Sequence, residues 1–186
     1  MRRAACVAIT VILAIMACCQ PAAASEDLGL GLASAATQLG GAGAAAVAFL
    51  VGMASDPALG EDLLNATVIT GALVGVGKVL LGRARPFVPG ADGGFTGFSL
   101  DDAYHSMPSG HTANAFAMAT VLARHRPRWA PAAYLAAVAV GLSRIALGVH
   151  WPSDVMVGAT LGTLIGSAVV DGRLCLFEID GIAPRI

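Results

Sequence analysis

The feature that most constrains the fold is a series of apolar stretches separated by short polar segments. Residues 28–55 contain no charged side chain, and residues 63–82 are interrupted only by Lys78. Both runs are long enough to cross the hydrocarbon core of a bilayer as helices. Three shorter stretches follow, at about 112–123, 129–149 and 155–170. Their lengths alone also fit the core helices of a soluble protein.

Composition favours a membrane protein over a soluble one. Apolar residues make up 56% of the chain and charged residues 12%, against about 45–50% and about 25% in soluble domains. Glycines four residues apart, as at Gly158, Gly162 and Gly166, allow helices to pack closely in membranes. Gly71 and Gly75 share this spacing. We therefore expect an all-α helical bundle, integral to the membrane, with five or six transmembrane helices. The alternative is a soluble bundle rich in alanine and glycine.

The N-terminus has the form of an export signal. Two arginines precede an apolar stretch over residues 4–19, and the small residues that follow suit cleavage after Ala24. We expect residues 1–24 to be either a signal peptide or an uncleaved first transmembrane helix. Residues 25–186 contain no linker, so we expect one domain there. Cleavage would leave Cys175 as the one cysteine, which excludes an internal disulfide.

Three separated polar blocks together hold two histidines, three basic side chains, a carboxylate and a serine–glycine pair. The blocks contain Lys78 and Arg85; Ser109, Gly110 and His111; and Arg144, His150 and Asp154. A transferring phosphoryl group spreads negative charge over its oxygens, so cleaving its ester needs positioned positive charge and hydrogen-bond donors. The blocks supply both, and no spacing of zinc ligands appears. They predict a phosphatase that works without a metal or another cofactor.

The basic residues and the serine–glycine pair are the predicted phosphate ligands. Arginine stays charged and donates two parallel hydrogen bonds from a planar fork, so Arg85 and Arg144 suit the phosphate oxygens, and Lys78 adds a point charge. Ser109 and Gly110 offer a hydroxyl and an unobstructed backbone N–H at the expected start of a helix. Such N–H groups and the helix dipole favour anions.

The two histidines are expected to divide the chemistry. A nucleophilic imidazole needs its second nitrogen held by an acceptor, which fixes the tautomer and stabilises the developing positive charge. Pro152 is typical of a helix start, so Asp154 is expected in the first turn and His150 just before it. The sequence predicts His150 as the nucleophile, Asp154 as its orienting group, and His111 as the general acid and base.

These blocks resemble the type-2 phosphatidic acid phosphatase family, which also includes vanadium haloperoxidases and soluble acid phosphatases. The family pattern is Lys, six residues, Arg-Pro; then Pro-Ser-Gly-His; then Ser-Arg, five residues, His, three residues, Asp. Every specified position is matched within about residues 61–171: Lys78, Arg85, Pro86, Pro108, Ser109, Gly110, His111, Ser143, Arg144, His150 and Asp154. The resemblance implies hydrolysis through a phosphohistidine intermediate, with the roles argued above.

The expected substrate is a phosphomonoester or pyrophosphate on a membrane lipid, since the composition is membrane-like. One alternative is a soluble periplasmic acid phosphatase that acts on small phosphate esters. Others are a vanadium haloperoxidase and an inactive membrane scaffold. A formal net charge of −1 gives no support for nucleic-acid binding.

Charge placement predicts which side of the membrane carries the site. With the N-terminal arginines in the cytoplasm, six crossings place residues 82–110 outside and the basic connection at 124–128 inside, in agreement with the positive-inside rule. Loss of a signal peptide leaves five crossings and the same sidedness. We expect a protein of the bacterial inner membrane with its site facing the periplasm. A soluble periplasmic protein is the alternative.

The long loop before His111 carries further polar residues. Residues 88–106 are rich in glycine and turn formers and are expected to roof the site. Arg83 lies outside the matched pattern and is expected to be solvated or to face lipid headgroups. Asp101, Asp102 and His105 are expected to be solvated loop residues.

Overall fold

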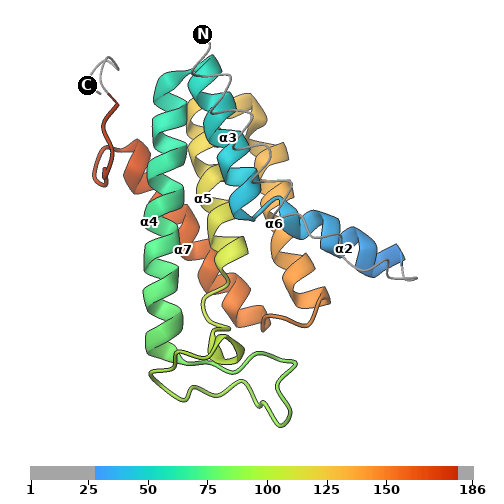
Figure 1. Ribbon diagram of the computed structural model, residues 1–186. Helices are drawn as coiled ribbons and strands as arrows, with labels where there is room; N and C mark the ends of the chain where they lie inside the picture. The colour runs from blue at the N-terminus through green and yellow to red at the C-terminus, as the bar shows by residue number, and fades with distance from the viewer. Residues whose placement is uncertain (1–27, 180–186) are drawn as a thin grey trace, which may run out of the picture.

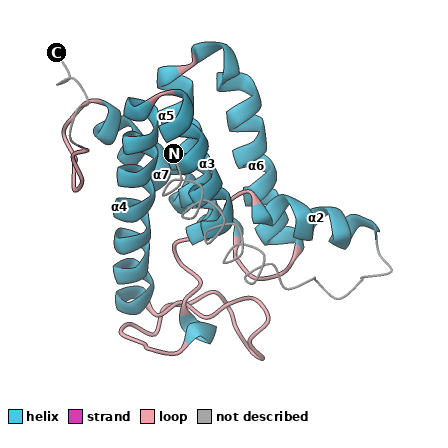
Figure 2. Ribbon diagram, turned by 45° about the horizontal axis from the view of Figure 1, so that its top comes forward, coloured by secondary structure: helices cyan, strands magenta, loops and turns pink. Residues whose placement is uncertain are grey.

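The computed structural model describes residues 28–179, and this part of the chain is helical, without a strand (Figures 1 and 2). The main helices are α2 (Leu28–Gln38), α3 (Ala42–Ser55), α4 (Pro57–Leu81), α5 (Gly110–His125), α6 (Ala130–Ala146) and α7 (Pro152–Val170). Short 3-10 helices, η1 (Asp102–Tyr104) and η2 (Pro127–Trp129), lie in the connections. The expected all-α bundle is confirmed. The predicted signal peptide or first helix at 1–24 lies outside the described residues.

Helix α5 occupies the middle of the bundle and packs against α4, α6 and α7. Its contact with α7 is close because three glycines of α7 face it. A Cβ added at Gly158, Gly162 or Gly166 would lie 2.6, 2.0 or 2.7 Å from a carbonyl oxygen of α5 or of the residue before it. The close packing predicted from this glycine row is therefore confirmed.

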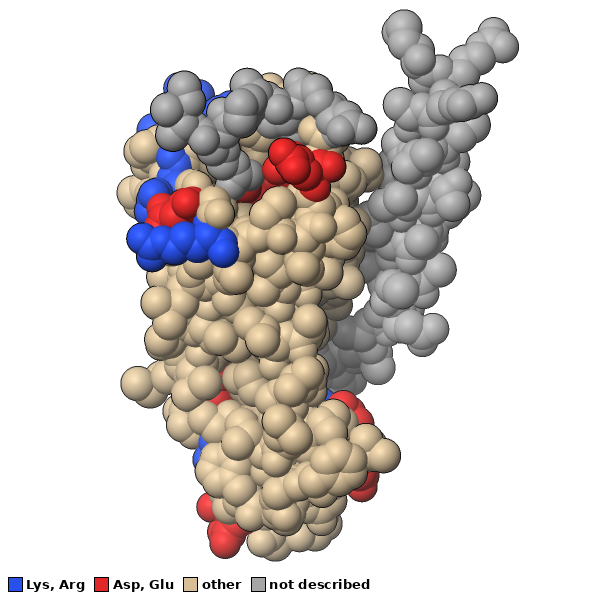
Figure 3. All heavy atoms as spheres, turned by 90° about the vertical axis from the view of Figure 1, so that its left-hand side faces the viewer, with Lys and Arg blue, Asp and Glu red and all other residues tan. Residues whose placement is uncertain are grey.

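Large apolar side chains cover the outside of the bundle, where lipid would lie. On α4, Leu73, Val76 and Leu80 are 48–60% exposed. Gly71 and Gly75 have open space beside them, since an added Cβ would meet nothing within 4 Å. The helix packing predicted at these two glycines is therefore wrong. Figure 3 shows an uncharged band on one face, with charged side chains towards its two ends.

Three helical segments are long and apolar enough to cross a membrane: Pro57–Leu81, Pro127–Ala146 and Pro152–Val170. Helices α2 and α3 add a fourth if they count as one span bent by 47°. The prediction of five or six crossings also counted 1–24 and the region of α5. At 16 residues, α5 is shorter than a typical spanning helix of about 20 residues, although it runs between the two ends of the bundle and packs against α4, α6 and α7.

The apolar run at 28–55 is broken where α2 meets α3. The corner packs onto the first turn of α5: a Cβ added at Gly40 would lie 2.4 Å from the carbonyl oxygen of His111. Asn114 of α5 also donates a hydrogen bond to the carbonyl of Gly40, at 3.2 Å. The break therefore brings α2 to the end of the bundle where α5 begins.

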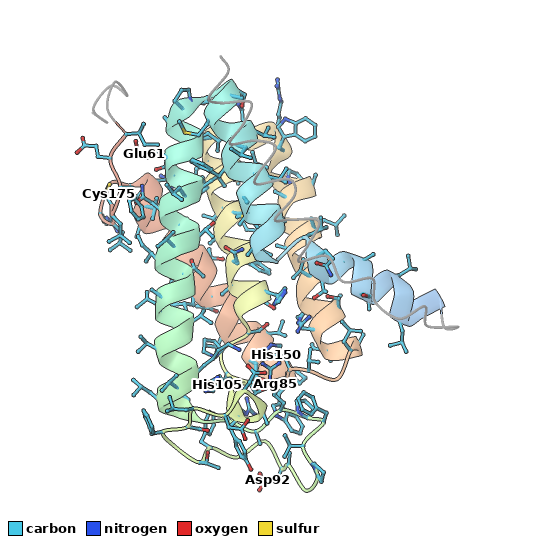
Figure 4. The ribbon with its side chains drawn as sticks, viewed as in Figure 1. Glu61, Arg85, Asp92, His105, His150 and Cys175 are labelled. Atoms are coloured by element: carbon cyan, nitrogen blue, oxygen red, sulfur yellow. The ribbon has the colours of Figure 1, made fainter. Side chains whose placement is uncertain are left out.

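Polar contacts tie the C-terminal segment to the far end of α4. The Oδ1 atom of Asn65 accepts hydrogen bonds from the N–H groups of Leu176 and Phe177, at 2.8 and 2.9 Å. A Glu61 oxygen accepts one from the last described residue at 3.1 Å. Figure 4 shows Glu61 at the opposite end of the bundle from His150. The two ends of the molecule are thus chemically distinct.

Candidate active site

The three polar blocks meet at one end of the bundle. The N–H of Ser109, just before α5, donates a hydrogen bond to the carbonyl of Asp154 in α7, at 3.0 Å. Figure 4 shows Arg85, which follows α4, near His150, which precedes α7. The helix ends of α4, α5 and α7 therefore bring these residues together across more than 60 positions of sequence.

Lys78 lies in the last turn of α4, beside the start of α5. Its Nζ atom donates a hydrogen bond to the carbonyl of His105 at 2.6 Å. A Cβ added at Gly110 would lie 4.0 Å from its Cε atom. The ammonium group is thus held next to the backbone that opens α5.

Arg85 is bound to the loop that carries η1. Its Nε atom donates to the carbonyl of Asp102 at 2.9 Å, and its Nη2 atom donates to both carboxylate oxygens of that residue at 3.0 Å. The Asp102 side chain is 81% exposed, and Asp101 is also exposed, as expected for the loop. The same expectation is wrong for His105, whose side chain is 16% exposed and whose Nε2 lies 2.9 Å from the carbonyl of Ser99.

Arg144 lies in the last turn of α6 and reaches α2. Its Nη1 atom donates a hydrogen bond to Oγ1 of Thr37 at 2.7 Å, and Thr37 is buried. The Nε atom of Arg144 is also buried but has no hydrogen-bond partner within residues 28–179. A buried donor without a partner is rare, and an anion bound in the site would satisfy it.

The start of α5 offers backbone donors. Ser109 is fully buried, its N–H is bound to the Asp154 carbonyl, and its hydroxyl lies 2.9 Å from Oγ1 of Thr112. The N–H of Gly110 has no partner within the described chain, as is usual for the first residue of a helix. An anion at this helix start would accept hydrogen bonds from the unpaired N–H groups of the first turn, Gly110 among them. The hydroxyl of Ser109 is also a donor when Thr112 donates in their contact.

His150 and Asp154 flank the start of α7 at Pro152, as predicted. The Nδ1 atom of His150 lies 3.6 Å from Oδ2 of Asp154, which is longer than a hydrogen bond. This buried Nδ1 has no hydrogen-bond partner in the part of the chain that the structure describes. The two groups are therefore neighbours without a direct hydrogen bond between them.

Burial lowers the pKa of His150 below its usual value of 6.5. The carboxylate of Asp154 opposes this shift, whereas the charges of Lys78, Arg144 and Arg85 add to it. The lowered pKa keeps the imidazole neutral near pH 7, and the neutral form is the one that can act as a nucleophile.

His111 is the second residue of α5 and faces the corner between α2 and α3. A Cβ added at Gly41 would lie 3.8 Å from its Nε2 atom. The ring is half-buried, and it forms no hydrogen bond within residues 28–179. It is therefore available to exchange a proton with a bound molecule.

A sequence model of the PAP2 superfamily matches residues 61–173. The chain belongs to the PAP2 superfamily. Three lipid A 1-phosphatases are similar to it: 40% identical over 102 residues in Porphyromonas gingivalis, 36% over 106 in Rhizobium etli, and 35% over 137 in Rhizobium johnstonii. These alignments cover 53%, 56% and 69% of this chain but only 20%, 46% and 56% of those relatives.

Solved structures of PAP2 proteins share the fold. Aquifex aeolicus LpxE superposes with a TM-score of 0.67 at 25% identity, covering 80% of this chain and 88% of that one. A transmembrane PAP2-type phosphatidylglycerolphosphate phosphatase from Bacillus subtilis gives 0.56 at 23% identity, covering 92% and 96%. With its apolar spans, this PAP2 chain is an integral membrane protein.

Sequence reasoning missed Arg83, which lies within the PAP2 match. The prediction of a solvated or headgroup-facing side chain is wrong: it is 11% exposed, and its Nη1 atom lies 2.6 Å from Oδ1 of Asp154. Ser106, fully buried, donates to the other oxygen of that carboxylate at 2.5 Å. One sequence signal was present, because Arg83 and Arg85 are two residues apart, and in an extended segment such side chains point to the same side.

The loop at 88–106 lies across the site end of the bundle, where a roof was expected (Figure 1). It bonds back to the residues after α4: Thr96 N–H donates to the carbonyl of Gly82 at 2.9 Å, and Ser106 N–H donates to that of Arg83 at 3.0 Å. These bonds hold the loop against the helix ends that carry the site.

Proposed function

We propose that this chain is a membrane lipid phosphatase that transfers phosphate from a lipid to His150 and then to water. The observation that carries the proposal is the meeting of His150 and His111 with three basic side chains at one end of a membrane-spanning bundle. Transfer to a histidine needs no metal, because Lys78, Arg85 and Arg144 supply the positive charge that phosphoryl transfer requires.

In the first step, the Nε2 atom of His150 attacks phosphorus, since Nδ1 faces Asp154. The bond between phosphorus and the lipid oxygen breaks, and protonated His111 gives a proton to the leaving oxygen. Burial and the neighbouring cations lower the pKa of His111 to about 4 in the free site, and the negative charge of the bound phosphate raises it again. Asp154 stabilises the positive charge on the phosphorylated ring by accepting a hydrogen bond from Nδ1–H, and the proton stays on the ring. In the second step, His111 takes a proton from water, the oxygen attacks phosphorus, and the P–N bond breaks. Inorganic phosphate leaves and His150 returns to its neutral form.

The substrate class follows from the site's position and from the relatives. The site lies at the end of apolar helices, where the headgroup of a lipid would lie. Three relatives bear the name lipid A 1-phosphatase. A fourth, from Mycobacterium tuberculosis, is named decaprenylphosphoryl-5-phosphoribose phosphatase and is 44% identical over 66 residues, 36% of each chain. All these names describe a phosphate on a large lipid, and the 1-phosphate of lipid A is the first substrate to test.

We place the protein in a bacterial inner membrane with the site facing the periplasm. Helix α5 begins in the site and ends at His125, about 24 Å away at 1.5 Å per residue. The basic residues 124–128 therefore lie at the opposite end, which the positive-inside rule assigns to the cytoplasm.

The experiment that tests the function is a panel assay of the purified full-length protein in detergent. Phosphate release is measured from lipid A, phosphatidylglycerophosphate, phosphatidate and undecaprenyl pyrophosphate. We expect turnover of at least one lipid, retention of labelled phosphate on protein quenched in acid-free conditions, and neither with His150→Ala. Absence of turnover on every lipid, or labelling of His150→Ala at the wild-type yield, would overturn the proposal.

A further inference from the structure

Arg83 is built into the start of α7, although it follows α4. Its Nη1 atom donates to Oδ1 of Asp154 at 2.6 Å and to Oγ of Ser153 at 2.7 Å. Its Nε atom donates to the carbonyl of Gly93 in the loop at 2.8 Å. Two of the three guanidinium nitrogens therefore donate hydrogen bonds to other residues of the protein. The group contacts the carboxylate of Asp154.

Aromatic rings restrict the same guanidinium. It lies over the ring of Phe95, 5.1 Å from the centroid, and over that of Trp151, 5.7 Å from the centroid. Cations at such distances are attracted by the ring faces. Gly93 leaves room for it, because a Cβ there would come within 3.1 Å of the Arg83 Nη2 atom. A planar cation fits this space and a flexible ammonium fits it less well.

The contacts divide the two oxygens of Asp154 between different partners. Arg83 takes Oδ1, whereas Oδ2 accepts from the hydroxyl of Ser106 and from the N–H of Trp151, at 2.5 and 2.8 Å. Oδ2 is also the oxygen that faces Nδ1 of His150. A carboxylate held by both oxygens cannot rotate, and its negative charge is balanced in a position with no exposure to solvent.

We propose that Arg83 is a positioning residue that acts on the reaction through Asp154, by holding Oδ2 in the direction of Nδ1 of His150. This inference rests on the proposed function, because it assumes that His150 receives the phosphate. Lys78, Arg85 and Arg144 bind the phosphate without help from Arg83. Its removal therefore slows phosphate transfer and leaves phosphate binding nearly unchanged.

The test uses full-length protein in detergent, with p-nitrophenyl phosphate and the best lipid of the panel as substrates. For Arg83→Gln we expect kcat to fall about 10- to 100-fold, the loss typical when a residue that orients a metal-bound histidine is removed from a metalloenzyme. KM and the inhibition constant for inorganic phosphate should stay within about twofold. Arg83→Lys, which keeps the charge, should recover part of kcat. If gel filtration shows that Arg83→Gln does not fold, Arg83→Lys is the variant on which kcat and KM are compared with the wild type.

Thr96→Val is the matched control, because Thr96 anchors the same loop by a bond from Oγ1 to the Gly82 carbonyl at 2.6 Å without touching Asp154. It should leave kcat nearly unchanged. In an Asp154→Asn background, Arg83→Gln should lower kcat little further. The effects of mutations at two residues that act as a unit do not add.

Three results would overturn the role of Arg83. The first is an equal fall of kcat on Arg83→Gln in the wild-type and Asp154→Asn backgrounds. The others are a change in KM rather than kcat, or an equal fall of kcat in Thr96→Val. Failure of the wild-type protein on all substrates is a different outcome. It would overturn the proposed function, and this role with it.

Discussion

Arg144 of α6 and Thr37 of α2 are joined by a hydrogen bond of 2.7 Å between Nη1 and Oγ1. The bond connects a proposed phosphate ligand to a helix outside residues 61–173, the segment that matches the PAP2 superfamily. Helix α2 is therefore part of the structure that shapes the site. The consequence can be tested at the threonine.

Thr37→Val should raise KM about tenfold and affect kcat less. A hydrogen bond to a charged group contributes about 1.5–3 kcal/mol, and its loss leaves the Arg144 guanidinium less well directed at the substrate phosphate. Steady-state kinetics on the best lipid of the panel measure the change. Thr160→Val is the control, since that hydroxyl bonds only within α7 and is exposed. A wild-type KM for Thr37→Val would contradict the prediction.

The acid limb of the pH profile of kcat/KM should lie below pH 6.5. Neutral His150 is the attacking form, and its pKa is lowered by burial, so activity is lost only as the pH falls through that lowered value. Because the Asp154 carboxylate raises this pKa, Asp154→Asn should move the limb to still lower pH while reducing the rate. The profile is measured from about pH 4 to 9. A limb above pH 6.5 would be inconsistent with His150 as the nucleophile.

Hydrolysis should survive EDTA and be inhibited by vanadate. Three basic side chains supply the positive charge, and vanadate resembles the transition state of phosphoryl transfer. Phosphate release is measured after chelation and dialysis, with and without added magnesium. Strict dependence on magnesium would mean that the basic residues do not suffice.

Single cysteines at the two ends of the bundle should differ in labelling by an impermeant thiol reagent in intact spheroplasts. Leu100→Cys, in a loop residue that is 77% exposed, should react in a protein otherwise free of cysteine. Pro127→Cys should react only after lysis, and native Cys175, which is exposed near the same far end, should behave in the same way. Labelling of Pro127→Cys alone would place the site in the cytoplasm.

Gly162→Val should prevent α5 and α7 from packing and should abolish activity. A Cβ at this position would lie 2.0 Å from the carbonyl oxygen of Ala113, which belongs to the backbone and cannot rotate away. The melting temperature in detergent measures the loss of stability. Gly75→Ala is the control, because its Cβ would meet open space and alanine favours the helix by about 0.5–1 kcal/mol. A wild-type melting temperature for Gly162→Val would exclude this close packing.

Local patterns in the sequence predicted much of the fold and the composition of the site. Apolar runs indicated the helices, and Pro152 indicated the start of α7 between His150 and Asp154. The glycine row of α7 indicated a close helix contact. Each of these depends on neighbours in sequence or on spacing along one helix, which a sequence displays directly.

What the sequence did not reveal depends on the packing of distant segments. Arg83 and Thr37 reach their partners across 71 and 107 residues, and no local pattern indicates which way either side chain points. Gly71 and Gly75 have the spacing of a packed row but face outwards. The break between α2 and α3 falls at Gly40 and Gly41. This pair lies inside the run at 28–55, whose lack of charged residues predicts one continuous crossing.

The bond from Ser109 to the Asp154 carbonyl has a consequence for how the protein is made. Lys78 and Arg85 leave the ribosome long before α7, the last helix of the described chain, which carries Asp154. Helices that insert one after another into a membrane pack together afterwards, so the site is completed only when α7 reaches α5. A nascent chain that stops before α7 carries all three basic residues proposed to bind phosphate but lacks Asp154. On the proposed function, activity would therefore report that membrane insertion has finished.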